Sequence, residues 1–233
     1  MRSGHLVFAA LFLLSLGSLA AARDQSAVRF TDPTDIDNRY LPLAKFERCV
    51  LRGREDGVRV RVVRRLLDRT RRFRHVGQRF DAAVIEDRSF EAGELVERTL
   101  DYFAQGDGGT VWYLGEHVDN YEDGKVVDHD GSWLYGKHTD RMGVAMPANP
   151  RVGTRWRHED VPGVTTESDK VVAILDRVTV RGKTYRRVLK VRELVRPERE
   201  REFKLYAPGV GNIKERPPDG RVTLVGCERK ETR

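Results

Sequence analysis

Carboxylate, hydroxyl and amide side chains alternate with apolar ones along Glu94–Gln105. If this segment is a strand, Glu97, Asp101 and Gln105 lie on one face, because successive strand side chains point to opposite faces. Such a row can do acid–base chemistry or orient polar groups of a ligand. Glu97 and Asp101 would be roughly 13 Å apart along a strand, which is too far for the carboxyl pair of a glycoside hydrolase. No catalytic residue is therefore predicted.

Two further segments carry the same alternation. Residues 110–116 place Trp112 and Glu116 on one face, and residues 200–206 place Lys204 between two polar neighbours on another. These rows either face solvent or line the interior of a curled sheet, and both interpretations stay open. The second predicts a polar pocket with aromatic walls, whose ligand-binding residues would be Glu97, Asp101, Gln105, Trp112, Glu116, Trp133, Glu202, Lys204 and Tyr206.

Motifs for other chemistries are weak or missing. The sequence contains no GxSxG elbow, phosphate-binding loop or dinucleotide-binding glycine pattern, so no cofactor is predicted. Residues 119–124 with Asp130 partly resemble a calcium loop, but Tyr121 occupies the third position. His117, His129 and His138 lie in the same region without a diagnostic metal-ligand spacing. No metal site is predicted.

The first residues are typical of a secretory signal. Arg2 and His5 precede an apolar run over residues 6–16, and small residues follow up to Ala22. We expect cleavage after Ala22, so residues 1–22 would be a signal peptide and the mature protein would be secreted. No apolar run reaches 18 residues, so a membrane-spanning helix is not expected.

Export affects how the two cysteines are interpreted. Cys49 and Cys227 lie in strand-like segments at opposite ends of the mature chain. In an oxidising compartment an even pair usually forms a disulfide. The sequence therefore predicts a bridge between the first and the last strand, with two buried free thiols as the alternative.

Short alternating segments with turn residues between them dominate the mature chain. Hairpin turns are predicted at residues 106–109 and 181–183, and residues 64–74 are left open between strand, loop and short helix. About ten strands without a linker predict one antiparallel β domain, either a barrel or a curled half-barrel. Residues 23–39 would form an N-terminal arm and residues 40–233 the single domain.

Several stretches occur together in one known group of proteins. They are DNRYLPL at 37–43, GELVERTLDYFAQ at 93–105 followed by TVWYLGE at 110–116, GSW at 131–133, MPA at 146–148 and EFKLYAPGVG at 202–211. In these the chain resembles an uncharacterised family of secreted bacterial β-rich proteins. Cys49 departs from the aromatic residue usual in that family. The resemblance implies an exported β-rich domain like the bacterial lipoprotein carriers in shape, and it specifies no reaction.

The charge is positive and concentrated. The chain has 43 basic and 36 acidic side chains, and residues 59–79 contain many arginines with Asp68 as the one acid. Such a segment attracts polyanions and anionic membrane surfaces. Because an exported protein rarely meets nucleic acid as its target, an anionic envelope polymer fits better, and nucleic-acid binding is not expected.

Together these features favour a secreted, non-enzymatic, barrel-like binding domain. Its ligand would be apolar or amphiphilic, or a component of the cell envelope. One alternative is an extracellular hydrolase or cyclase that uses the interior carboxylates. Another is a structural envelope protein that associates through the arginine-rich segment.

Overall fold

The computed structural model describes residues 25–196 and 201–230, and it is mainly β, with 68% strand and 3% helix. The predicted signal peptide lies outside the described residues. Two single-turn 3-10 helices, η1 (Gln25–Ala27) and η2 (Leu43–Lys45), precede the first strand. No helix in the described ranges is long and apolar enough to cross a membrane.

The described strands form one antiparallel sheet. Along the sheet their order is β6-β5-β4-β3-β2-β1-β14-β13-β12-β11-β10-β9, and β7 and β8 also pair with β5. The strands are β1 (Phe46–Glu55), β2 (Val58–His75), β3 (Gln78–Glu91), β4 (Glu94–Gln105), β5 (Val111–Glu122), β6 (Lys125–Asp128), β7 (Trp133–Leu134), β8 (Gly143–Met146), β9 (Arg155–Val161), β10 (Thr165–Val180), β11 (Lys183–Arg196), β12 (Arg201–Ala207), β13 (Gly211–Arg216) and β14 (Gly220–Arg229).

The curled, unclosed antiparallel sheet confirms the predicted fold class. The described chain has fourteen strands where about ten were expected. Residues 64–74, which the sequence left open, belong to the long strand β2. The β2–β3 register shifts between Leu66 and Thr70, so a bulge there interrupts the alternation that would have marked a strand.

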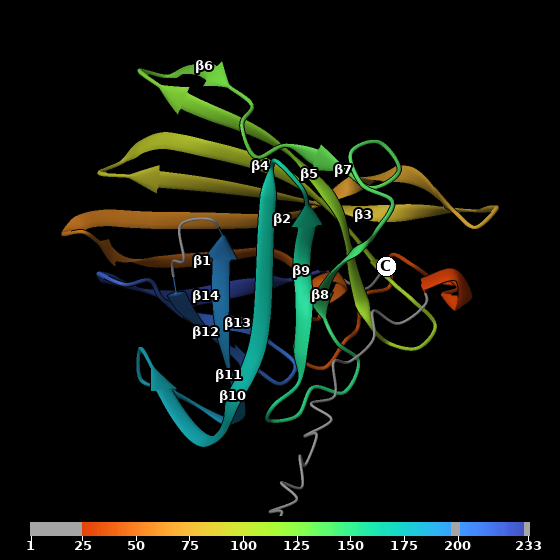
Figure 1. Cartoon of the computed structure of the whole chain (residues 1–233). Helices are drawn as coiled ribbons and strands as arrows, with labels where there is room; N and C mark the ends of the chain where they lie inside the picture. Colours follow the sequence, from red (N-terminus) through yellow and green to blue (C-terminus); the bar gives the residue numbers. More distant parts are fainter. Residues whose placement is uncertain (1–24, 197–200, 231–233) are drawn as a thin grey trace, which may run out of the picture.

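The sheet curls until its two ends approach each other. Figure 1 shows β9 and β10 crossing in front of β3, β4 and β5. Strand β8 lies between the ends: it pairs with β5, and a Cβ built on Gly143 would lie 2.0 Å from the carbonyl oxygen of His158 on β9. A glycine at this position therefore lets β8 and β9 come into close contact.

Apolar side chains pack on both sides of the sheet. The inner cluster includes Tyr113, Trp133, Leu189 and Tyr206. A second cluster covers the outer side of β3, β4 and β5, where Phe30 from the segment before β1 stacks on Phe80 at 4.0 Å. A third lies around β1, β13 and β14. Both sides of the sheet are thus covered over β3, β4 and β5, as the apolar residues on both of their faces require.

The predicted disulfide between Cys49 and Cys227 is present. The two residues face each other directly in the β1–β14 register, with Cα atoms 4.1 Å apart. The bond joins the first strand of the sheet to the last, 178 residues later. In the chain-entropy description it would stabilise the fold by roughly 5 kcal/mol at most.

Candidate functional site: an acidic interior

Carboxyl groups gather on the inner side of the curled sheet. They come from strands at both ends of the sheet order, and the curl brings them into one region. We call them the acidic interior: Asp87, Glu97, Asp101, Glu116, Glu159, Glu167, Asp169, Glu193, Glu202 and Glu215. The cationic side chains that interact with them electrostatically are Arg64, His158 and Lys204. Carboxyl groups therefore outnumber the cations among them.

Asp101 on β4 is buried, with 8% of its surface exposed. Its Oδ1 accepts a hydrogen bond from the Tyr113 hydroxyl at 2.6 Å, and its Oδ2 accepts one from the Thr99 hydroxyl at 3.2 Å. Burial and the nearby charge of Asp87 raise the pKa of Asp101 to about 7, although both hydrogen bonds oppose this. Asp101 therefore changes charge near neutral pH.

Glu116 on β5 meets Glu159 on β9 where the two ends of the sheet approach. The Trp133 indole N–H donates to Glu159 Oε1 at 3.0 Å, and the Thr165 hydroxyl donates to Oε2 at 2.9 Å. These bonds fix both carboxylate oxygens of Glu159 in place. Burial, Asp101 and Glu159 raise the pKa of Glu116 to about 10, so Glu116 holds the proton of its hydrogen bond to Glu159.

The His158 ring lies beside two carboxyl groups of β10. Its Nδ1 is 3.2 Å from Asp169 Oδ2 and 3.5 Å from Glu167 Oε1. Burial lowers the pKa of His158, but Glu167, Asp169 and Glu159 outweigh it and raise that pKa to about 10. His158 is therefore an imidazolium at neutral pH, and it also packs edge-on against the Tyr113 ring.

Two carboxylate oxygens beside His158 lack hydrogen bonds. Among the described residues, Asp169 Oδ1 and Glu167 Oε1 are buried without a hydrogen-bond partner. Burial raises the pKa of Glu167 to about 8 against the opposing charge of His158. Single side-chain atoms of His158, Glu167 and Asp169 lie within 4.8 Å of one another, and the imidazolium of His158 supplies the positive charge of this group.

Lys204 on β12 continues the acidic interior toward β11. Its Nζ is 2.7 Å from Glu193 Oε2, and Glu193 is itself buried. Burial lowers the pKa of Lys204, but Glu193 and Glu202 outweigh it, so the ammonium group stays charged. Burial also raises the pKa of Glu202 to about 8, against the attraction of Lys204.

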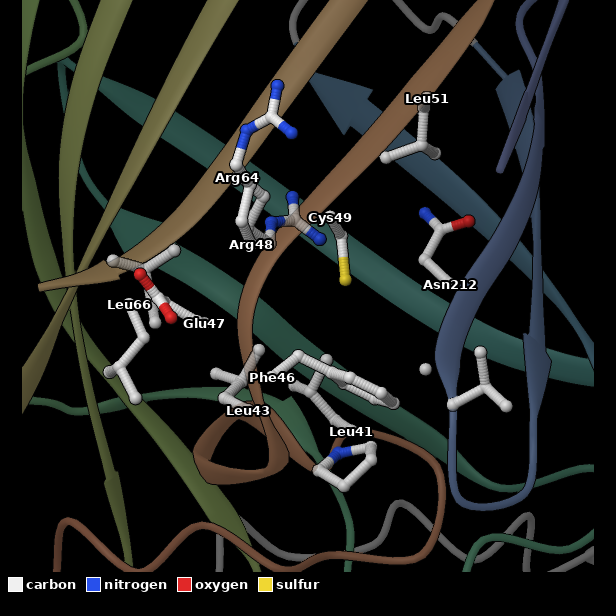
Figure 2. Close-up of a pocket in the computed structure, with 14 residues that line it drawn as sticks. Leu41, Leu43, Phe46, Glu47, Arg48, Cys49, Leu51, Arg64, Leu66 and Asn212 are labelled. Atoms are coloured by element: carbon white, nitrogen blue, oxygen red, sulfur yellow. The ribbon is translucent and has the colours of Figure 1, made fainter. Parts of the chain in front are cut away.

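A small pocket opens next to this region, at the start of β1. Figure 2 shows Leu41, Leu43 and Phe46 gathered there, with Arg64 and Asn212 among the other lining residues. Arg64 makes a two-pronged ion pair with Asp87, at 3.0 Å from Nε to Oδ1. The cavity measures about 30 Å³, enough for only one or two water molecules. The pocket wall is mostly apolar, and the half-buried Arg64–Asp87 pair connects it to the acidic interior.

The structure brings most of the predicted ligand-binding residues together. Glu97, Asp101, Glu116, Glu202, Lys204, Trp133 and Tyr206 all belong to the acidic interior or to the inner apolar cluster around it. Gln105 instead accepts a hydrogen bond from the Asn38 backbone N–H at 2.9 Å and donates to Asp37 at 2.7 Å. It fixes the segment before β1 to the end of β4.

Trp112 lies on the other side of the sheet. It packs in the second apolar cluster, while its neighbour Tyr113 is in the inner one. The expectation that Trp112 and Glu116 share a face is therefore wrong. Asp101 pairs with Glu116 but Phe103 pairs with Tyr113, so β5 has one extra residue, and Gly115 there has φ of +119°. This bulge turns Glu116 inward and leaves Trp112 outside.

Sequence reasoning did not select the other half of the site. The predicted ligand-binding residues do not include His158, Glu159, Glu167 and Asp169, which come from β9 and β10. Glu167 and Asp169 are two residues apart, a spacing that places both on one face of a strand. That signal could have added them to the predicted row.

In comparisons with known proteins, no protein-family model, no curated protein and no solved structure matches the chain.

Proposed function

We propose that this protein is an exported, non-enzymatic binding protein whose site is the acidic interior. The observation that carries the proposal is the excess of buried carboxyl groups over the cations among them. Burying a carboxylate is costly unless it is paired or protonated. A ligand with a positive charge would supply the missing counter-charge. The expected ligand is therefore amphiphilic rather than purely apolar.

The rings around the site suit the apolar part of such a ligand. Tyr113, Trp133 and Tyr206 pack in the inner cluster, and aromatic faces attract an ammonium group as well as hydrocarbon. The neighbouring cavity has room for only one or two water molecules, so the chain of such a ligand enters only when the segment at residues 41–46 moves. We therefore propose a small organic ammonium compound as the ligand class.

Export is proposed on two grounds. The first residues have the charge and hydropathy pattern of a secretory signal. The Cys49–Cys227 disulfide is compatible with an oxidising compartment. Binding is proposed rather than glycoside hydrolysis because the sequence carries no hydrolase motif and Glu97 and Asp101, four residues apart on β4, are roughly 13 Å apart along the strand, which is more than such hydrolysis requires.

The test compares two probes of equal size on residues 23–233. Thermal unfolding would be followed at pH 7.5 with hexylammonium and with the neutral 1-hexanol. We expect hexylammonium to raise the melting temperature and 1-hexanol to leave it unchanged, because only the ammonium pairs with the carboxylates. The Asp169→Asn variant should reduce the shift, whereas Glu122→Gln, at the exposed end of β5, should keep it.

Two results would overturn the proposal. One is an equal shift with both probes, which would indicate a purely apolar site. The other is a shift with hexylammonium that Asp169→Asn leaves unchanged. Native mass spectrometry of protein from its own culture medium would then show which compound, if any, accompanies the chain.

A further inference from the structure

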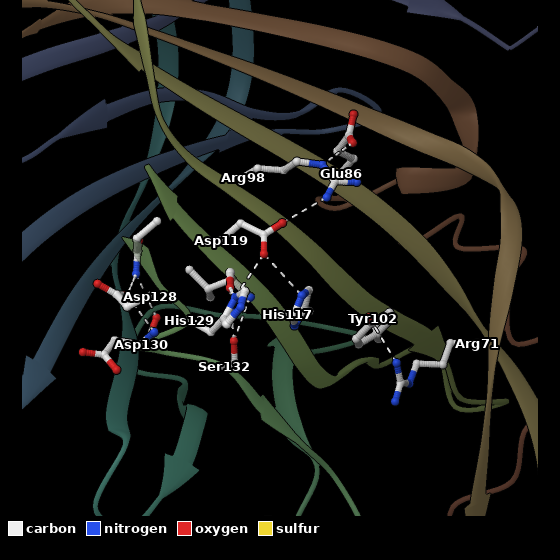
Figure 3. A network of polar contacts seen from close by, with 12 residues as sticks. Arg71, Glu86, Arg98, Tyr102, His117, Asp119, Asp128, His129, Asp130 and Ser132 are labelled. Atoms are coloured by element: carbon white, nitrogen blue, oxygen red, sulfur yellow. Dashed lines mark hydrogen bonds and ion pairs between the residues drawn. The ribbon is translucent and has the colours of Figure 1, made fainter. Parts of the chain in front are cut away.

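A second group of polar side chains lies on the outer side of the sheet, away from the acidic interior. His117 and Asp119 are two residues apart on β5, so they share a face. In the β4–β5 register, Asp119 pairs with Arg98, which belongs to the outer face. His129 follows β6, the strand that folds back beside β5. Figure 3 shows both histidines directed at the Asp119 carboxylate.

The nitrogen and oxygen atoms of the three side chains are spaced like the ligand atoms around one metal ion. His117 Nε2 is 3.3 Å from Asp119 Oδ1, and His129 Nδ1 is 3.1 Å from the same oxygen. The two imidazole rings stack with centroids 5.1 Å apart. In a tetrahedral zinc site with bonds of 2.0–2.1 Å, ligand atoms are roughly 3.3–3.4 Å apart. Both spacings to Asp119 are therefore close to those of a zinc site, and all three ligand atoms lie within 4.8 Å of one another.

The carboxylate is held so that one oxygen faces the histidines. Arg98 Nη1 donates to Asp119 Oδ2 at 3.1 Å, and Arg98 Nε donates to Glu86 at 2.8 Å. Asp119 itself is only 8% exposed. Burial and the Arg98 bond fix the rotamer of Asp119 and leave Oδ1 toward the two rings. Partners of this kind orient the ligands of metal sites in proteins.

The turn that carries His129 is fixed as well. The His129 ring nitrogen Nδ1 lies 2.8 Å from the Val118 carbonyl oxygen, and the Ser132 hydroxyl accepts from the Val118 N–H at 2.8 Å. The Asp130 N–H donates to Asp128 Oδ1 at 2.9 Å. The Ser132 and Asp130 bonds do not use the His129 ring, so they still hold the turn when Nδ1 leaves the Val118 carbonyl to bind an ion.

We propose that His117, Asp119 and His129 form a surface site for a divalent transition-metal ion such as Zn²⁺. Two imidazoles and one carboxylate suit zinc, copper or nickel, whereas calcium and magnesium prefer oxygen ligands alone. The side chains of His117 and His129 are 47% and 56% exposed, so an ion reaches them from solvent and one coordination position stays open. When His129 Nδ1 binds the ion, its proton moves to the solvent-facing Nε2.

The test is titration of metal-free residues 23–233 with Zn²⁺ by calorimetry at pH 7.5. We expect a tight site that His117→Gln and His129→Gln each weaken at least tenfold, since each removes a ligand. The control is His138→Gln, an exposed histidine that accepts a hydrogen bond from the Leu134 N–H instead. It should bind zinc like the unchanged protein. Circular dichroism would check that each variant keeps its β structure.

A fourth variant separates this site from the interior. Glu167→Gln alters the buried group around His158 and should leave the tight zinc site unchanged. Co²⁺ in place of Zn²⁺ should give visible absorption that disappears in His117→Gln. The proposal is overturned if zinc binds no more tightly than millimolar, or if Glu167→Gln rather than His117→Gln removes the binding. Neither result bears on the binding of hexylammonium.

Discussion

Tyr113 connects the two halves of the acidic interior. Its hydroxyl donates to Asp101 on β4, and its ring contacts both Trp133 and His158. Burial raises the pKa of Tyr113 well above its ordinary value, so the hydroxyl remains a donor over the physiological pH range. Asp101 depends on this bond, because burial otherwise disfavours its charge.

Replacing Tyr113 with phenylalanine should therefore destabilise the protein by about 1–3 kcal/mol at pH 8, where Asp101 is ionised. The ring contacts remain, so the loss reports the hydrogen bond. The free energy would be measured by urea unfolding. The cost should shrink at pH 5.5, where Asp101 is protonated. Tyr121→Phe, near the turn between β5 and β6, is the control, and an equal loss in both variants would contradict the assigned role.

Residue alternation predicted part of the site correctly, for a physical reason. Glu97 and Asp101 on β4, and Glu202 and Lys204 on β12, keep the strict period of two that their regular strands impose. Whether such a row faces a pocket or water depends on the direction of curl, which is a property of the whole sheet. His158 could not be selected, because its partners Glu167 and Asp169 are known only from the register with β10.

At the level of elements, glycines decide how the ends of the sheet meet. Gly115 has φ of +119° and lets β5 bulge, and its missing side chain leaves room for the Trp133 carbonyl. Gly143 has no such backbone requirement but lies against the His158 carbonyl. Any side chain at position 143 would push β8 and β9 apart. The edge-on contact between the Tyr113 and His158 rings would then be lost.

The Gly143→Ala variant should therefore lose at least about 2 kcal/mol, because the added methyl group would overlap backbone atoms. Gly108→Ala is the matched control: a Cβ there has no neighbour within 4 Å, and we expect a change within about 0.5 kcal/mol. Thermal unfolding of both variants would measure the difference. If Gly143→Ala were as stable as Gly108→Ala, the close approach of β8 and β9 would not hold in solution.

Strands that carry their own alternation were predictable, and short ones were not. The bounds of Glu94–Gln105 agree with the prediction, and both predicted hairpins join neighbouring strands. Strands β6, β7 and β8 contain only two to four residues each. Such segments are strands because β5 offers them hydrogen bonds, which no local pattern reveals.

At the scale of the whole molecule, the acidic interior links folding to proton uptake. Burial raises the pKa of Glu167 and Glu202 to about 8 and that of Asp101 to about 7, above their ordinary values near 4. The folded chain therefore holds protons that the unfolded chain releases above about pH 5. His158 acts in the same direction, since its pKa rises from 6.5 to about 10.

Stability should accordingly fall as pH rises from 5.5 to 8.5, because the unfolded state binds fewer protons throughout this range. Salt-bridged carboxyls on the outer face, such as Glu86, have a lowered pKa and lose their contribution only below about pH 4, outside the range. A net change of about two pK units corresponds to about 3 kcal/mol, which would lower the melting temperature by roughly 6–12 °C. Calorimetric scans at several pH values would measure this.

Glu202→Gln tests whether the interior causes that slope. An amide cannot titrate, so the variant should lose less stability than the unchanged protein between pH 5.5 and 8.5. Glu122→Gln, exposed on β5, should keep the full slope. A hexylammonium ion bound in the interior would replace the lost protons and flatten the slope at high pH. If the unchanged protein were instead most stable at pH 8.5, the carboxyl groups would be ionised and solvated, and a cation would have no buried charge to neutralise.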